Sequence, residues 1–255
     1  MSDETIETLM DHKSIRKYQD KDLAEEDIEK IVKAGRQAAF VSQMYSVIME
    51  RDEDDIPFGA PVRFTICVDI NKLEKVMEKR DWDLITNDMT LLLFGIEDAS
   101  YMAQNMVIAA ESMGLGTCYL GSPIRTAKNL KEKYDLPDRV FPLVQLVIGY
   151  PAEDPPTRPR YPLNFVLFED EYPELSDKEI EEAMEEMDEG YLEQDYYRKL
   201  DAKIPLKGDE SDDYTYEDYS WTEHISRKWG QWYEDLEKQK EILEACGFDI
   251  EEGDD

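Results

Sequence analysis

Apolar positions recur at steps of three and four residues between positions 87 and 113, and this spacing predicts one long central helix. The stripe consists of Leu92, Ile96, Ala99, Ala103, Val107 and Ala110. Gly114 follows the stripe directly, and glycine there is typical of a left-handed cap that ends a helix. The same periodicity predicts shorter helices from the N-terminus to about His12, over residues 24–38 and over residues 126–134.

Apolar or β-branched runs between these helices predict strands at residues 45–50, 62–69, 117–120 and 140–150. Helices and strands alternate irregularly along the chain. We therefore expect an α+β fold with an antiparallel or mixed central sheet flanked by helices, in preference to a parallel doubly wound sheet.

The chain changes character after Pro162, where acidic residues become dense. The pattern predicts a Glu-rich helix over residues 176–191, an acidic loop around residues 211–213 and one final helix over residues 220–246. The apolar stripe of that final helix comprises Trp221, Ile225, Trp229, Trp232, Leu236 and Leu243. An apolar stripe of this kind is expected to be buried against another part of the chain or against a partner subunit. We expect a core at residues 1–170 and an acidic helical extension at residues 171–255 that packs on the core or on a partner subunit.

The net charge narrows the choice of partners. The 255 residues contain 61 acidic and 29 basic side chains, a formal charge of −32. Nucleic-acid binding depends on neutralising phosphates with Lys and Arg, so this composition argues against DNA, RNA and anionic membrane surfaces as partners. Apolar residues still make up 41% of the chain, which excludes disorder of the whole chain.

The cysteines and histidines do not form a metal-binding pattern. Cys67, Cys118 and Cys246 are far apart in the sequence, and His12 and His224 are the two histidines. We therefore expect no metal site. Scattered cysteines in an odd number and an N-terminus without leader-like character favour a cytoplasmic location.

Two basic islands stand out against the acidic background. The first comprises His12, Lys13, Ser14, Arg16 and Lys17, and the second is Arg158-Pro159-Arg160. Together they could hold a phosphate monoester. The alternative remains open that the first island compensates a helix dipole and the second pairs with surface carboxylates.

The segment from Gly114 to Ser122 contains three glycines but does not match a dinucleotide-binding fingerprint, because its glycines follow a helix and not a strand. The backbone at Gly121 and Ser122 could approach a flat ligand closely. A plain helix-to-strand turn explains the same residues. Cys118 has no evident base nearby in sequence, which argues against a cysteine hydrolase.

Four segments resemble the FMN-dependent NAD(P)H nitroreductases and flavin reductases, nearest the NADPH-linked, oxygen-insensitive branch. Residues 11–18 resemble the opening motif H-R-S-I-R-x-(F/Y). Residues 98–121 resemble D-x-x-x-A-Q-N-x-x-x-A-A-E-S-x-G-L-G-x-x-Y-(I/L)-G almost position by position. Residues 136–162 are similar to the elements L-P-x-x-V-x-P-L, G-(Y/W)-P and (K/R)-P-R-x-P, and residues 221–225 to W-(S/T)-x-H-(I/V).

The resemblance implies an intertwined homodimer with FMN in a groove between subunits. His12, Lys13, Ser14 and Arg16 would hold the phosphate and ribityl chain together with Arg158 and Arg160. The residues expected along the isoalloxazine ring are Tyr119, Leu120, Gly121 and Ser122, with a backbone amide near Gly121 at flavin N5. Ser42 and Gln43 resemble residues that contact FMN from one of the two subunits.

The implied chemistry is hydride transfer from NADH or NADPH to flavin N5 and then to a small-molecule acceptor, in a ping-pong cycle that requires no catalytic side chain. Acceptors in the family include nitroaromatics, quinones and flavins. One alternative is a flavin-binding storage or sensing module that docks a basic partner without efficient turnover. Another is specialised flavin chemistry such as dehalogenation or flavin fragmentation.

Two segments depart from the resembled branch. Residues 52–55 are all acidic, and the chain around them lacks the glutamine that would contact the pyrimidine edge of the flavin. Residues 193–219 hold nine acids and four bases where the branch places basic residues for its coenzyme. We therefore expect NADH to serve at least as well as NADPH.

Overall fold

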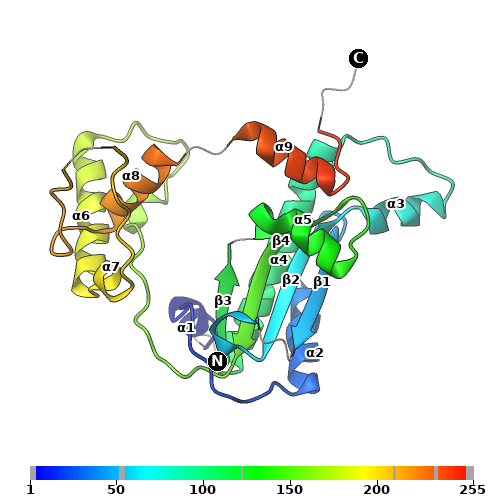
Figure 1. Ribbon diagram of the computed structural model, residues 1–255, viewed down its shortest axis with the longest axis horizontal. Helices are drawn as coiled ribbons and strands as arrows, with labels where there is room; N and C mark the ends of the chain where they lie inside the picture. Colours follow the sequence, from blue (N-terminus) through cyan, green and yellow to red (C-terminus); the bar gives the residue numbers. More distant parts are fainter. Residues whose placement is uncertain (1–3, 52–54, 122, 209–210, 233–234, 251–255) are drawn as a thin grey trace. The chain divides into compact units, whose positions relative to one another are not determined.

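The computed structural model describes residues 4–51, 55–121, 123–208, 211–232 and 235–250 (Figure 1). The chain forms two compact units. The first unit comprises residues 1–155 and 235–255, and the second comprises residues 156–234. The expected division into a core at 1–170 and an extension at 171–255 stays a prediction about functional domains.

The first unit is built on a four-stranded sheet in which all neighbouring strands are antiparallel. Its strands are β1 (Tyr45–Arg51), β2 (Val62–Asp69), β3 (Gly116–Leu120) and β4 (Val140–Gly149), in the order β1-β2-β4-β3. These bounds agree with the predicted strands to within one residue at each end. The α+β prediction is confirmed.

The two faces of the sheet follow from alternation along β2, whose residues are all buried. Phe64, Ile66 and Val68 belong to the main core with the long helix α4 (Asp88–Ser112). Cys67 points to the other face and packs near Tyr134 of α5 (Pro123–Tyr134). Side chains of a strand alternate between faces, so α4 and α5 lie on opposite sides of the sheet (Figure 1).

Helix α4 is the predicted central helix, and Gly114 after it has a φ of +75° as the cap pattern requires. Helix α2 (Glu25–Gly35) packs against it through Ile28 and Ile31. The remaining helices of the unit are α1 (Glu4–Met10), α3 (Asn71–Glu78), α9 (Leu236–Ala245) and the short 3₁₀ turn η1 (Pro57–Gly59). None of the helices in the described ranges could cross a membrane, since none is both long and apolar enough.

The prediction of one helix over residues 220–246 is wrong. Two helices, α8 (Trp221–Gln231) and α9, belong to different compact units. Trp232 is extended at the end of α8, and the Asp235 side chain accepts a hydrogen bond from the Glu237 amide to begin α9. An aspartate N-cap starts a new helix. The predicted apolar stripe is therefore divided between α8 and α9.

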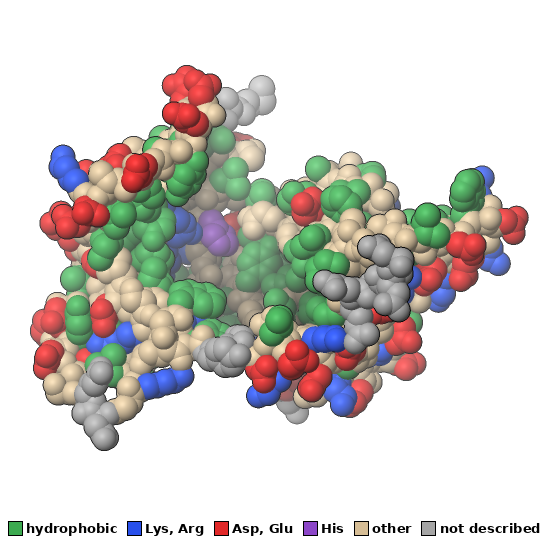
Figure 2. Space-filling model, turned by 90° about the horizontal axis from the view of Figure 1, so that it is seen from above, with side chains coloured by type: hydrophobic (Ala, Val, Ile, Leu, Met, Phe, Trp, Pro, Cys, Tyr) green, Lys and Arg blue, Asp and Glu red, His purple; other side chains and the backbone are tan. Residues whose placement is uncertain are grey.

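The second unit contains α6 (Asp177–Glu193), α7 (Tyr196–Lys199), α8 and the turn η2 (Leu163–Phe165). Ser176 and Glu179 form a reciprocal capping box at the start of α6, which matches the predicted Glu-rich helix. An aromatic cluster joins the helices: Tyr197 contacts Tyr219 edge-on with ring centroids 5.4 Å apart. Figure 2 shows acidic side chains spread between hydrophobic patches on the face that it presents.

A buried charge cluster lies on the α5 face of the sheet, where Glu50 of β1 accepts hydrogen bonds from Arg63 at 2.6 Å and Tyr134 at 2.5 Å. Lys133 pairs with its second oxygen at 2.5 Å. The side chains of Glu50 and Arg63 are only 8% and 7% exposed. Burial opposes ionisation of Glu50, but the donors outweigh it and lower its pKa to about 2.

We expect this cluster to make the free energy of unfolding decrease at acidic pH. Because the pKa of Glu50 is lower in the folded state, its contribution is present above the ordinary value of 4.5 and is lost as the pH falls towards 2. The difference corresponds to about 3 kcal/mol. Urea unfolding at pH 6 and pH 3 checks this: the loss between the two pH values should be smaller in Glu50→Gln than in the parent. Equal losses in both proteins would contradict it.

Candidate functional site

The first basic island lies alongside β3. The Ile15 amide donates to the Thr117 carbonyl at 2.8 Å, and Ser14 forms an isolated parallel bridge with Thr117. Gly116 permits this approach, because a Cβ there would lie 2.7 Å from the Ile15 side chain. The sheet edge thus brings residues 12–16 next to the strand that leads to Gly121.

His12 of this island is joined to α4 and β3 through Glu111. His12 Nδ1 lies 2.8 Å from Glu111 Oε1, and the Thr117 hydroxyl donates to the same oxygen at 2.7 Å. Three segments that are separate in the sequence therefore converge on one carboxylate.

The basic side chains of the island differ in their pairing. Lys13 lies 2.6 Å from Asp154 and 3.2 Å from Asp11, and its hydrogen bond to Asp154 is the largest of the effects that raise its pKa. The Arg16 amide donates to Glu153 Oε1 at 2.5 Å. Carboxylates from the segment itself and from the loop after β4 therefore contact this island.

The end of β3 offers an open backbone. Gly121 is exposed, and a Cβ built there would meet no atom within 4 Å. Tyr119 and Leu120 before it are half-buried, and burial raises the pKa of the Tyr119 phenol, which stays neutral. Burial likewise raises the pKa of the Cys118 thiol, consistent with the argument against a cysteine nucleophile. Ser122 lies outside the described residues.

Ser42 and Gln43 occupy a loop that Asp98 of α4 holds in place. The fully buried Asp98 carboxylate accepts hydrogen bonds from the amides of Val41 at 2.5 Å, Ser42 at 3.0 Å and Met44 at 2.9 Å. Gln43 sits between them with a φ of +55°. Both residues line a groove beside β1. Sequence reasoning missed Asp98 and Glu111 as anchors, although acidic residues that interrupt a largely apolar helix were the available signal.

The loop with Ser42 and Gln43 and the open end of β3 lie at opposite edges of the sheet. The loop leads into β1, whereas Gly121 follows β3, and β2 and β4 lie between these strands. Three strand spacings amount to about 14 Å. The two groups of predicted contacts are therefore separated by the width of the sheet within one chain.

The second basic island belongs to the other compact unit. Arg158 donates to Gln194 at 2.5 Å, and its guanidinium lies 4.1 Å from the centre of the Tyr196 ring. Arg160 donates to the carbonyls of Arg158 and Pro159 at 3.0 and 3.1 Å. Each guanidinium thus contacts a group from its own unit. That both islands share one phosphate stays a prediction.

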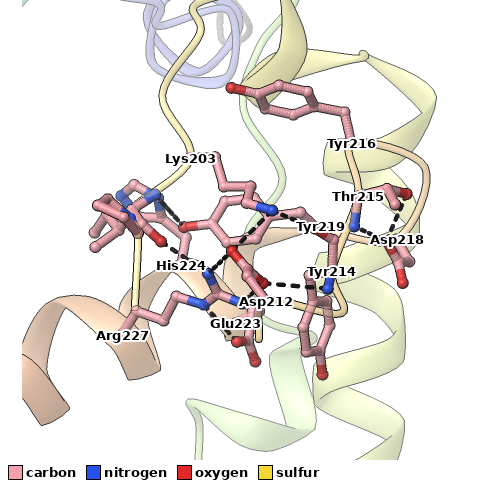
Figure 3. A network of polar contacts seen from close by, with 12 residues as sticks. Lys203, Asp212, Tyr214, Thr215, Tyr216, Asp218, Tyr219, Glu223, His224 and Arg227 are labelled. Carbon is pink, nitrogen blue, oxygen red and sulfur yellow. Dashed lines mark hydrogen bonds and ion pairs between the residues drawn. The ribbon is translucent and has the colours of Figure 1, made fainter. Parts of the chain in front are cut away.

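The W-T-E-H-I element begins α8 and forms part of the polar network in Figure 3. The Tyr219 hydroxyl lies 3.1 Å from His224 Nδ1, and the imidazole stacks on Tyr197 with ring centroids 4.5 Å apart. Burial lowers the pKa of His224, which favours its neutral form. Arg227 forms two 2.8 Å bonds to Asp212. These contacts hold α8 against the loop that precedes it in the sequence.

The antiparallel sheet, its long central helix and the motifs at its edge define a nitroreductase-type fold, and comparison with known proteins agrees. The solved structure of B. megaterium NfrA2 superposes with a TM-score of 0.82 at 27% identity, covering 98% of this chain and 99% of that one. Residues 48–150 match the model of the nitroreductase family.

Two curated relatives extend the match. The Cr(VI) reductase of Pseudomonas sp. (strain G-1) is 35% identical over 72% of this chain and 82% of its own length. The FMN reductase (NAD(P)H) of Bacillus subtilis (strain 168) is 31% identical over 97% of this chain and 99% of its own. The chain belongs to the nitroreductase family.

Proposed function

We propose that this protein is an FMN-dependent oxidoreductase that takes hydride from NAD(P)H and passes it to a nitroaromatic, quinone or flavin acceptor. The observation that carries the proposal is the pairing of residues 12–16 with β3, which puts cationic and hydroxyl side chains beside a strand that ends in the open Gly121. These residues fit FMN, because a terminal phosphate needs cations and hydrogen-bond donors while a flat ring needs an accessible backbone.

FMN, when bound, supplies the hydride-transfer chemistry. In this proposal the chain's residues bind and orient it: His12, Lys13, Ser14 and Arg16 hold the phosphate and ribityl chain, and Arg158 and Arg160 are phosphate contacts. Tyr119, Leu120, Gly121 and Ser122 line the ring, and a backbone amide near Gly121 serves N5. The neutral phenol of Tyr119 avoids placing a negative charge beside an electron-rich ring.

The protein acts as a homodimer. Ser42 and Gln43 contact the FMN held by the partner subunit, a proposal supported by their position across the sheet from Gly121. The predicted site is therefore complete only when two chains combine.

Steady-state oxidation of NADH or NADPH with a quinone or a nitro compound tests the activity. We expect turnover that depends on FMN and shows the parallel double-reciprocal lines of a ping-pong cycle. If the chain binds FMN but consumes no reduced coenzyme with any acceptor, the alternative of a storage or sensing module is correct. Intersecting lines would contradict the ping-pong order alone.

The electron donor forms a further prediction. Within residues 193–219, Arg198 pairs with Glu217 at 2.5 Å and Lys203 with Asp212 at 2.8 Å (Figure 3 shows the latter). Lys199 donates to the Gln194 carbonyl at 2.9 Å, and Lys207 donates to the Gln231 carbonyl. Each of the four bases in this segment thus already contacts an acceptor within the protein. The net negative charge of the segment should therefore repel the extra phosphate of NADPH.

We therefore expect kcat/KM for NADH to equal or exceed that for NADPH, with the difference shrinking as salt is added. The measurement is kcat/KM for both donors at low and moderate ionic strength. A preference for NADPH above about tenfold, roughly 1.4 kcal/mol, would show that a basic contact overrides this segment.

A further inference from the structure

The convergence of His12 and Thr117 on Glu111 determines where the imidazole carries its proton. Glu111 Oε1 accepts a hydrogen bond from the Thr117 hydroxyl at 2.7 Å and lies 2.8 Å from His12 Nδ1. A carboxylate oxygen only accepts hydrogen bonds, so Nδ1 must be the donor. The Glu111 side chain is only 13% exposed, which strengthens its interaction with the imidazole.

We propose that Glu111 is a positioning residue: it holds the His12 proton on Nδ1, orients the ring and acts as counter-ion to the imidazolium that binds the FMN phosphate. The proposal rests on the proposed function. Only the protonated ring has N–H groups on both nitrogens, so Nδ1 can serve Glu111 while Nε2 donates to a phosphate oxygen. Glu111 itself touches no phosphate, because a second anion would repel it.

The charged groups around this segment favour the imidazolium. The acids are Glu111 from α4, Glu4 and Glu7 from α1, Asp11 from the segment itself, and Glu153 and Asp154 from the loop after β4, and they outnumber the bases Lys13 and Arg16, which oppose the imidazolium. Lys13 lies close to Asp154 and Asp11, so these opposite charges partly cancel one another and Glu111 remains the acid in contact with the imidazole. FMN binding should therefore weaken when Glu111 is replaced by an uncharged residue, because the imidazolium loses its counter-ion.

Nitrogen-15 NMR of the imidazoles tests the proton position directly without any ligand. The chain has two histidines, His12 and His224, so the spectrum is simple and His224 serves as an internal reference. In the neutral form of the parent, His12 should carry its proton on Nδ1. In Glu111→Ala it should shift towards the Nε2–H form. An Nε2–H tautomer in the parent would overturn the proposal.

Binding of FMN and of riboflavin, measured by flavin fluorescence across pH 6–9, tests the link to phosphate. Glu111→Gln keeps an oxygen acceptor for Thr117 and His12 but removes the charge. We expect it to weaken FMN binding about tenfold or more and to leave riboflavin binding within twofold. Glu97→Gln, an exposed acid on the same helix, is the matched control and should change neither.

A double-mutant cycle shows whether Glu111 acts through His12. In a His12→Ala background, Glu111→Gln should have no further effect on FMN affinity. An equal loss with and without His12, or an equal loss for FMN and riboflavin, would assign Glu111 a purely structural role and overturn the proposal. Failure of the parent chain to bind either flavin would instead refute the proposed function, while the NMR result would still stand.

Discussion

Replacing Asp98 with Ala should lower the free energy of unfolding by about 3–5 kcal/mol, because breaking a buried charged network leaves its partners unsatisfied. The carboxylate is fully buried and accepts hydrogen bonds from three backbone amides, those of Val41, Ser42 and Met44. Those amides have fixed positions in a loop whose Gln43 has a positive φ. The substitution therefore removes the acceptor for three donors at once.

Urea unfolding followed by circular dichroism measures this loss. Glu97→Ala is the matched control, since Glu97 is the preceding residue of the same helix but is exposed, and it should change stability by less than about 0.5 kcal/mol. A loss below about 1 kcal/mol in Asp98→Ala would mean that water or another group satisfies the loop amides. FMN affinity should fall as well, because the loop carries Ser42 and Gln43.

The substitutions Arg158→Ala and Arg160→Ala should each weaken FMN binding about 10- to 150-fold. This loss corresponds to one charge-assisted hydrogen bond of roughly 1.5–3 kcal/mol. Arg158 is already oriented by Gln194 and by stacking over Tyr196, so little further ordering is needed on binding. Arg160 donates to the carbonyl oxygens of Arg158 and Pro159, and a phosphate can replace these acceptors.

The dissociation constants of FMN and riboflavin separate phosphate contacts from ring contacts. We expect both Arg variants to lose FMN affinity while riboflavin affinity stays within twofold and the circular dichroism spectrum is unchanged. Arg198→Ala removes an arginine of the same unit that pairs with Glu217 and serves as the control. If both variants bind FMN as tightly as the parent, the second island is a surface feature.

The regular elements were predictable because their signals are local. The stripe from Leu92 to Ala110 and the apolar runs of β2 and β4 repeat with the period of the structure they form. Helix α3 was not predicted, although Leu73, Val76 and Met77 recur at helical spacing over its eight residues. The break between α8 and α9 also escaped, because an apolar stripe that continues past Trp232 looks like one helix although Asp235 caps a second.

The candidate site residues stay a prediction, and the sequence did not indicate which groups contact them. The motifs located residues 12–16 and Gly121, and the sheet brings them together through the Ser14–Thr117 bridge. The distant partners of Asp98 and Glu111 were not predictable, because the Met44 amide and the His12 ring lie 54 and 99 residues away in sequence. Sequence spacing does not encode such pairings. The same reason leaves the joint action of the two basic islands a prediction.

The visible spectrum of the purified protein, followed by identification of the chromophore released on denaturation, tests the central claim most directly. The proposal assigns one terminal phosphate to the first island and one flat ring to the open end of β3, and the sequence has no dinucleotide fingerprint. We therefore predict a yellow protein that releases FMN and not FAD. A colourless protein that fails to take up added FMN would contradict the account.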